Sequence, residues 1–181
     1  MAMGCPRAQR PIMPDYGVDR SDWEPLPWPW VADRLVENRN FWLVTVSADG
    51  RPHALPLWAV WSESDLQLAF GCGPRSRKAR NLDADSRAVV MIESTVECVS
   101  LEGTARMLEG ERRETCIERF LAKYQSAAPS LTAEYLRDNA MYEFQPERGF
   151  SIIEHEDQFA RRATKWSFEA VTYPGRMEVS T

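Results

Sequence analysis

Apolar and polar residues alternate over short stretches through much of this chain, which is the pattern of strands with one buried face. Residues 41–47 are rich in β-branched and aromatic side chains, and an Asp49-Gly50 pair follows them closely. That dipeptide between two apolar runs is a strong hairpin signal. The pattern therefore predicts a strand, a tight turn and a return strand over residues 51–61.

The rest of the chain continues in short elements of the same kind. Further strands are predicted over residues 66–70, 88–93, 98–108, 144–153 and 164–171, and helices over residues 31–39, 76–83, 109–125 and 131–139. Pro52 and Pro56 lack a ladder N–H, so the return strand is expected at a sheet edge or a bulge. Six or so strands with intervening helices predict a mainly β (α+β) fold, a small β-barrel with peripheral helices.

The N-terminal region has a different composition. Residues 1–30 hold six of the 12 prolines, which disfavour helix interiors and strand ladders, so an extended arm is predicted. Tryptophan is costly to leave in water, and Trp23, Trp28 and Trp30 lie toward the end of this arm. We expect that end to pack on the body or on a partner subunit. The chain is thus divided into an arm (1–30), a body (31–172) and a C-terminal tail (173–181).

The net charge, the hydropathy and the cysteine content of the chain mainly exclude classes of protein. The net charge of −5 argues against a general nucleic-acid role, which needs a cationic face. No apolar run approaches the roughly 18 residues of a membrane span, and the N-terminus lacks the apolar core of a signal peptide. The scattered cysteines favour reduced thiols in a cytoplasm over a metal site or a disulfide framework. They are Cys5, Cys72, Cys98 and Cys116.

One charged cluster stands out at the predicted start of the helix over residues 76–83. Its members are Arg75, Ser76, Arg77, Lys78 and Arg80. Backbone amides at a helix N-terminus attract anions, and hydroxyl and cationic side chains add charge-assisted hydrogen bonds. Cations alone are unfavourable at the positive end of a helix dipole. We therefore interpret the cluster as a phosphate site rather than a solvated helix start.

The order strand, Asp-Gly turn, strand, strand and Ser-Arg-Lys loop resembles the pyridoxamine 5′-phosphate oxidase-like split-barrel flavoproteins. In detail, residues 49–61 (DGRPHALPLWAVW) and 73–82 (GPRSRKARNL) are similar to their actinobacterial branch. Many proteins of that branch use the deazaflavin coenzyme F420 instead of FMN. The resemblance covers residues 31–170 and is strongest over 41–108. It implies a six-stranded split barrel like that of the FMN-binding proteins, and a homodimer with two cofactor sites at the subunit interface.

The resemblance also implies roles for particular residues. Ser76, Arg77 and Lys78 would hold the cofactor phosphate, with Arg80 and Asn81 assisting. The strand at residues 53–58 would run along the isoalloxazine or deazaflavin ring. Its members named for this contact are His53, Leu55, Pro56, Leu57 and Trp58.

Near the C-terminus, the segment over residues 159–166 is similar to the closing segment of this family, in which a Trp-containing strand approaches the partner's cofactor. Trp166 would take that role. Arg161, Arg162 and Lys165 would bind a phosphate, a carboxylate-rich tail or an anionic substrate, although a plain surface strand explains these cations almost as well. The segment departs from the substrate-phosphate motif of the pyridoxal-phosphate-forming oxidases, which argues against pyridoxamine phosphate oxidation.

Two side chains of the return strand leave alternatives open. His53 is the candidate for acid–base catalysis because imidazole titrates near neutrality, but a hydrogen-bonded wall residue fits its mid-strand position as well. Trp58 and Trp61 are three residues apart, so a regular strand would place them on opposite faces. One could line a flavin pocket while the other packs the core, or both could be packing residues.

The preferred hypothesis is an oxidoreductase in which bound F420, or alternatively FMN, carries a hydride to or from a small organic substrate. F420 is preferred because its polyglutamate tail would use surplus positive charge, which Arg75, Arg80 and the cations near the C-terminus supply. The alternative is a non-enzymatic flavin- or haem-binding carrier. A haem-binding protein would need an axial ligand, for which His53 and His155 are the candidates.

Overall fold

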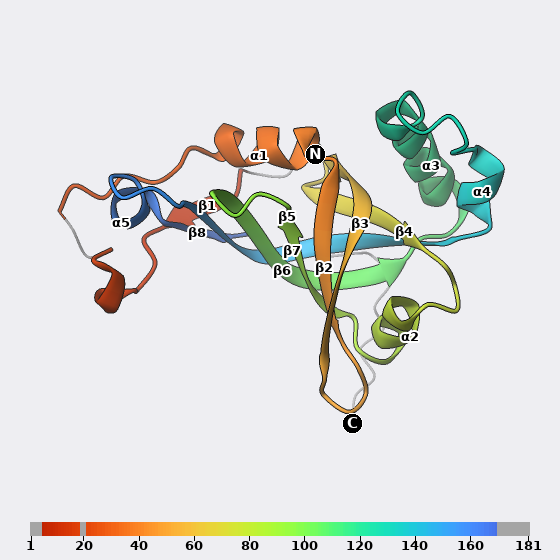
Figure 1. Cartoon of the computed structure of the whole chain (residues 1–181), viewed down its shortest axis with the longest axis horizontal. Coiled ribbons are helices and arrows are strands. Elements are labelled where there is room, and N and C mark those ends of the chain that lie inside the picture. Colours follow the sequence, from red (N-terminus) through yellow and green to blue (C-terminus); the bar gives the residue numbers. More distant parts are fainter. Residues whose placement is uncertain (1–4, 19–20, 170–181) are drawn as a thin grey trace.

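The structure is a computed structural model that describes residues 5–18 and 21–169. Its main strands are β2 (Asn40–Val46), β3 (Pro52–Ser62), β4 (Gln67–Cys72), β5 (Arg87–Ile92), β6 (Glu97–Met107) and β7 (Ala140–Ile153). Within the described residues these six antiparallel strands run in the order β7-β4-β3-β2-β5-β6, and β7 also pairs with β6, which closes a barrel (Figure 1). The predicted six-stranded split barrel is confirmed.

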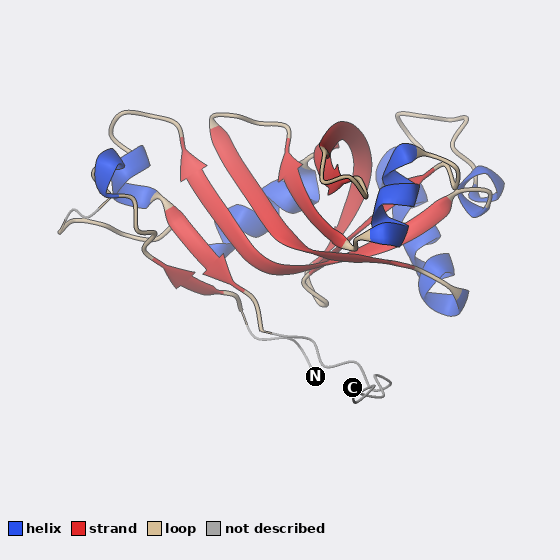
Figure 2. Ribbon diagram, turned by 90° about the horizontal axis from the view of Figure 1, so that it is seen from below, coloured by secondary structure: helices blue, strands red, loops and turns tan. Residues whose placement is uncertain are grey.

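Two short strands extend the barrel at one edge (Figure 2). β8 (Thr164–Ser167) pairs with β7, and β1 (Arg7–Gln9) pairs with β8. The arm is held further along by the indole N–H of Trp23, which donates to the carbonyl oxygen of Ala163 at 2.8 Å. The arm thus packs on the body of its own chain. It also adds a strand, β1, which its proline-rich composition did not predict. The last residues of the predicted strand over 164–171 lie outside the described residues.

The helices surround the barrel. They are α1 (Trp28–Glu37), α2 (Arg77–Ala84), α3 (Gly110–Tyr124), α4 (Ala133–Arg137) and α5 (Phe159–Arg162), with a 3-10 turn, η1, at Pro14–Tyr16. α1 begins three residues before the predicted start because Pro29 lies in its first turn, where a missing N–H costs nothing. No helix in the described part of the chain is long and apolar enough to cross a membrane.

Two apolar cores divide the interior. The barrel core includes Phe41, Phe70 and Phe144, each with no exposed surface. A second core lies between α3 and the outer face of β3, β4 and β7, where Ile117 and Met141 are buried. Burial of such side chains from water supplies the main driving force for both layers.

The two strand tryptophans lie in different cores, as their odd spacing predicted. The ring of Trp61 is 6.2 Å from that of Trp28 in the barrel core. Trp58 packs against the second core, where its ring stacks on Tyr124 at 4.8 Å. The strand is therefore regular across this stretch.

β6 and β7 shift register at one position. Glu102 lies opposite Arg148, but Gly103 lies opposite Pro146, so one residue of β7 is bulged out. A Cβ atom on Gly103 would lie 2.0 Å from the carbonyl oxygen of Gln145. Only glycine allows the two backbones to approach this closely.

We expect Gly103→Ala to lower the free energy of unfolding by roughly 1–3 kcal/mol or more, because the added methyl group must push backbone atoms apart. Urea denaturation of the purified protein measures this. Gly73→Ala is the matched control, since a Cβ there meets nothing within 4 Å, and it should change stability by less than about 0.5 kcal/mol. Equal midpoints for both variants would contradict the close approach.

Candidate functional site: a notch between β3 and α2

The barrel is split where β4 leaves β3. β4 pairs with β3 only from Ala59 to Ser62, whereas residues 52–58 of β3 pair with β2 alone. Pro52 and Pro56 lie in this half, so the predicted edge position is correct for half of the strand. Alternate backbone N–H and C=O groups on the open side have no neighbouring strand among the described residues, which leaves them available to a ligand.

α2 lies beside this open half, and we call the open half of β3 (residues 52–58) together with the first turn of α2 the notch. The side chain of Asn81 on α2 donates to the hydroxyl oxygen of Thr45 on β2 at 2.9 Å, and both residues are buried. Thr45 in turn pairs with His53 of β3. In Figure 1 α2 lies beside the stem of the β2–β3 hairpin. Asn81 therefore fixes the helix on the barrel, and its amide is engaged within the protein.

Ser76 caps α2. Its hydroxyl oxygen accepts a hydrogen bond from the backbone N–H of Ala79 at 3.2 Å, and the hydroxyl proton remains available for donation. The backbone N–H groups of Arg77 and Lys78 follow in the first turn, where a helix offers no internal acceptor. No other acceptor for these two groups occurs in the described parts of the chain.

The charge at this helix start is not neutralised within the described residues. None of its four cations forms an ion pair with a carboxylate there. They are Arg75, Arg77, Lys78 and Arg80. The pKa of Asp49 in the hairpin turn is lowered by the hydroxyl of Ser47, then by the Arg51 amide, with a smaller contribution from the charge of Arg77. Free amides, a hydroxyl and unpaired cations together fit a phosphate group.

A buried phenol lies near α2. Tyr142 is 2% exposed, and its hydroxyl has no hydrogen-bond partner among the described residues. Burial raises its pKa to about 12, with smaller contributions from Cys72 and Asp83, so the group stays protonated. A neutral hydroxyl that lacks a partner is a donor that a bound ligand or water would satisfy.

The residues predicted to follow the cofactor ring differ in exposure. Leu55 is 42% exposed and Pro56 is also exposed, whereas Leu57 is 8% exposed and belongs to the barrel core. His53 and Trp58 are half-buried. The first residues of the open half of β3 are therefore accessible at the surface, whereas Leu57 packs in the barrel core.

Trp58 is held from the α3 side. The hydroxyl of Tyr124, whose ring stacks on Trp58, accepts from the N–H of Ala59 at 3.0 Å and lies 2.6 Å from the Ala59 carbonyl oxygen. Lys123 also donates to that oxygen, at 3.1 Å, and its Nζ lies 5.2 Å from the centre of the Phe41 ring. Burial lowers the pKa of Lys123 to about 8 and raises that of Tyr124 to about 12.

Lys123 makes stability depend on pH. Its folded pKa lies below its ordinary value of 10.5, so the unfolded chain binds more protons between pH 8 and 10 and stability rises with pH there. In Lys123→Met this rise should be absent, while Tyr124 still satisfies the Ala59 carbonyl oxygen. Urea midpoints of both proteins at pH 7 and at about pH 9.5 test this. A constant difference between the proteins at the two pH values would contradict the lowered pKa.

The C-terminal candidates lie apart from this notch in the single chain. Trp166 is 1% exposed, and its indole N–H donates to the hydroxyl of Ser151 at 2.8 Å inside the barrel core. It therefore has no free face for a bound ring. Lys165 is exposed, and β8, which carries both residues, lies on the opposite side of the barrel from α2 in Figure 1.

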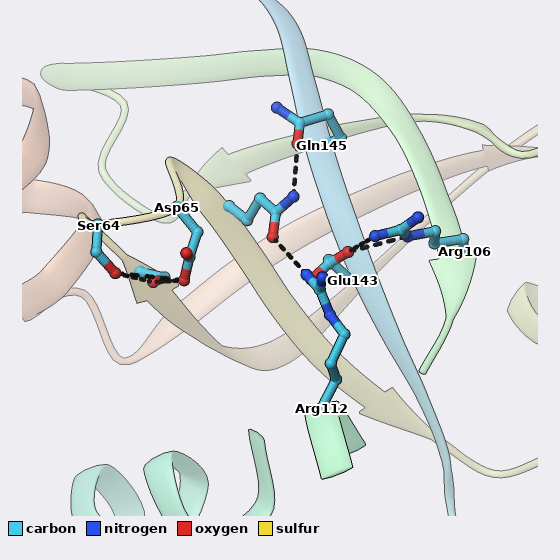
Figure 3. Close-up of polar contacts among 8 residues, drawn as sticks. Ser64, Asp65, Arg106, Arg112, Glu143 and Gln145 are labelled. Atoms are coloured by element: carbon cyan, nitrogen blue, oxygen red, sulfur yellow. Dashed lines mark hydrogen bonds and ion pairs between the residues drawn. The ribbon is translucent and has the colours of Figure 1, made fainter. Parts of the chain in front are cut away.

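Sequence reasoning missed a polar cluster on the outer face of β7, beneath α3 (Figure 3). Glu143 lies in an otherwise apolar stretch of β7, and its side chain is 8% exposed. Arg106 of β6 donates to it at 2.6 Å and 2.9 Å, and Arg112 of α3 forms a second ion pair. A carboxylate within an apolar strand pattern was the available signal, because a buried charge needs a partner.

The described residues contain no cluster of His, Cys, Asp and Glu that could hold a metal ion. The cysteines Cys5, Cys72, Cys98 and Cys116 are all unpaired.

A family model described as pyridoxamine 5′-phosphate oxidase matches residues 29–152, which include the whole barrel apart from the end of β7 and the notch with its Ser-Arg-Lys segment. This is more than half of the chain. The protein belongs to the pyridoxamine 5′-phosphate oxidase family. The sequence resemblance at the family level is thus confirmed, and the deazaflavin branch stays a prediction. Among curated proteins, none matches this chain.

Solved structures share the fold of this family member at low identity. HutZ, a haem storage protein from Vibrio cholerae, is 21% identical with a TM-score of 0.58, over 70% of this chain and 97% of that one. A haem-binding protein from Mycobacterium smegmatis is 16% identical with a TM-score of 0.62, over 80% and 60%. A protein of unknown function from Agrobacterium tumefaciens is 22% identical with a TM-score of 0.58, over 67% of this chain. The match spans 53%, about half, of that last protein.

Proposed function

We propose that the protein is an oxidoreductase that binds coenzyme F420, or alternatively FMN, in the notch between β3 and α2. The observation that carries the proposal is the set of unpaired cations around the free amides of the α2 N-terminus, next to the open half of β3. Family membership supports it, because the flavoproteins that this chain resembles hold a cofactor phosphate at a Ser-Arg-Lys segment.

In this proposal each group of the notch has one task. The Ser76 hydroxyl and the amides of Arg77 and Lys78 donate to the phosphate, and the two cationic side chains neutralise it. Asn81 keeps the helix in place through Thr45. The open edge of β3 orients the ring through backbone groups, and His53 is a candidate to hold a proton near it.

The bound cofactor would supply the hydride chemistry, and the protein would supply orientation and exclusion of water. This division explains why the notch needs no conspicuous acid–base pair. F420 is favoured over FMN because Arg75 and Arg80 add positive charge beyond what one phosphate requires. The substrate is proposed only as a small organic molecule.

Arg77→Ala combined with Lys78→Ala should weaken cofactor binding by roughly 2–5 kcal/mol, because two charge-assisted contacts are lost. Fluorescence titration of the purified protein with F420 and with FMN measures this and also identifies the preferred cofactor. Arg148→Ala is the control, since it removes an exposed cation paired with Glu102. Unchanged affinity in the double variant would remove the α2 site from the proposal.

We also propose that two copies of the chain form a homodimer with the cofactor at their interface. The outer face of β2, β3 and β5 supports this, since Trp42 is 41% exposed and pairs with Pro56 on one side and Met91 on the other. Val44 continues the same face along β2. This apolar surface adjoins the open half of β3, so a second copy seated on it would cover the notch.

Trp42→Glu should convert the dimer to a monomer of 20.8 kDa, because a charge at the centre of an apolar interface is desolvated without a partner. Light scattering after size-exclusion chromatography gives the mass. Tyr135→Glu is the control, as Tyr135 is 58% exposed on α4, away from that face. A monomeric parent protein, or a dimer that survives Trp42→Glu, would contradict this interface.

A haem-binding carrier is the second candidate, favoured by the haem proteins among the solved structures of the same fold. His53 on the open half of β3 and the exposed His155 are the candidate axial ligands. A carrier would give a Soret band with haem that alanine at one of these positions removes. It would also fail to oxidise reduced F420 or FMN in the presence of substrates.

A further inference from the structure

A cavity lies on the outside of the barrel, apart from the notch. It has a volume of about 240 Å³ and is bounded by α3 from Arg112 to Arg119, the β3–β4 turn, β4 and β7. Pockets for drug-sized ligands measure roughly 300–1,000 Å³, so a flavin or a haem is too large for this space. The cavity shares no lining residue with the notch at α2. It therefore calls for a different, smaller ligand.

One wall of the cavity is a fixed polar network (Figure 3). Arg112 donates to Glu143 and, at 3.3 Å, to the side-chain oxygen of Gln67. The side-chain N–H of Gln67 donates to the side-chain oxygen of Gln145 at 2.6 Å. Arg106 holds the other oxygen of Glu143. Two guanidinium groups share one carboxylate, so this wall carries a net charge of about +1, and its charged groups are engaged within the network.

Two further charges of the cavity have no ion-pair partner within the described residues. Arg119 of α3 is half-buried, and its guanidinium makes one long contact, 3.5 Å, with the carbonyl oxygen of Trp61. Asp65 accepts from the hydroxyls of Ser62 and Ser64, which aim its carboxylate without neutralising it. One cation and one anion are thus anchored around the same end of β3, and each keeps capacity for a charged partner.

Apart from Thr115, the remaining lining is apolar. Ala69 and Leu108 are buried beside the cavity, and so is Cys116. Burial raises the pKa of Cys116 to about 12, so its thiol stays neutral and behaves as a small apolar group. The cavity therefore combines one unpaired positive charge, one unpaired negative charge and an apolar floor.

We propose that this cavity binds a free α-amino acid. The carboxylate pairs with Arg119, the ammonium group pairs with Asp65, and the side chain lies against Ala69, Leu108 and Cys116. A planar guanidinium suits a carboxylate because it can donate two parallel hydrogen bonds. A simple anion would meet Asp65 and a simple cation would meet Arg119, so only a ligand with both charges satisfies the two walls together.

Isothermal titration calorimetry of the full chain with each of the common L-amino acids tests the proposal. At least one should bind with a dissociation constant at or below about 1 mM. The matching amine, which lacks the carboxylate, and the matching acid, which lacks the amino group, should each bind at least about tenfold more weakly. Binding of none of the amino acids, or an equal affinity for the acid or the amine, would overturn the proposal.

Two variants locate the site. Arg119→Gln should weaken binding of the amino acid but leave the weak binding of the amine unchanged, because the amine has no carboxylate. Asp65→Asn should also weaken binding of the amino acid but leave the weak binding of the acid unchanged, because the acid has no ammonium group. If either residue had only a structural role, its substitution would instead weaken the binding of the amino acid, the amine and the acid to the same extent. Arg148→Gln, which removes the same charge from an exposed pair with Glu102, should have no effect. An affinity that survives Arg119→Gln would overturn the assignment. Titration with F420 or FMN tests the notch separately, since the two sites share no residue.

Discussion

β7 is hydrogen-bonded to other strands along both of its edges, and the rest of the structure depends on this pairing. This strand hydrogen-bonds to β6 along most of its length, to β4 through its first half and to β8 through its second half. It closes the barrel at one end and extends the sheet at the other, where β8 receives the N-terminal arm. The bulge opposite Gly103 lets β7 bend between these two neighbours, and the lack of a side chain there is what permits the contact.

The candidate cofactor site follows from the same geometry. β4 follows β7 as far as Cys72 but leaves β3 after Phe70, so the first half of β3 has an open edge. The chain then turns directly into α2, whose cationic start lies beside that edge because Asn81 is tied to Thr45. The unpaired edge of β3 and the cationic N-terminus of α2 therefore lie together because β4 separates from β3 at this point. Both features are suited to ligand binding, because open backbone groups and a helix N-terminus offer hydrogen-bond donors to an anion.

The outer layer, in which α3 packs on β4 and β7, combines apolar packing with buried charge. α3 covers β4 and β7 with apolar contacts over most of its length, but near its N-terminal half the packing gives way to a cavity with charged walls. Glu143 is tolerated there because two arginines from different elements hold it. Arg119 and Asp65 lack such compensation within the described residues. The same helix therefore packs through Phe120 and Tyr124 and lines the cavity through residues between Arg112 and Arg119.

The sequence by itself determined the local elements and the chemistry of the helix start. The hairpin at Asp49-Gly50, the six barrel strands and the Ser-Arg-Lys segment were readable because turn chemistry, alternation and charge are local properties. Only the tertiary structure decided what depends on contacts distant in sequence. It placed Trp166 in the core, paired β1 with β8, and assembled Glu143, Arg112 and Arg106 from three elements. Residues so far apart in sequence carry no mutual signal in a single chain, and barrel closure, the added edge strands and the packing of α3 bring them together.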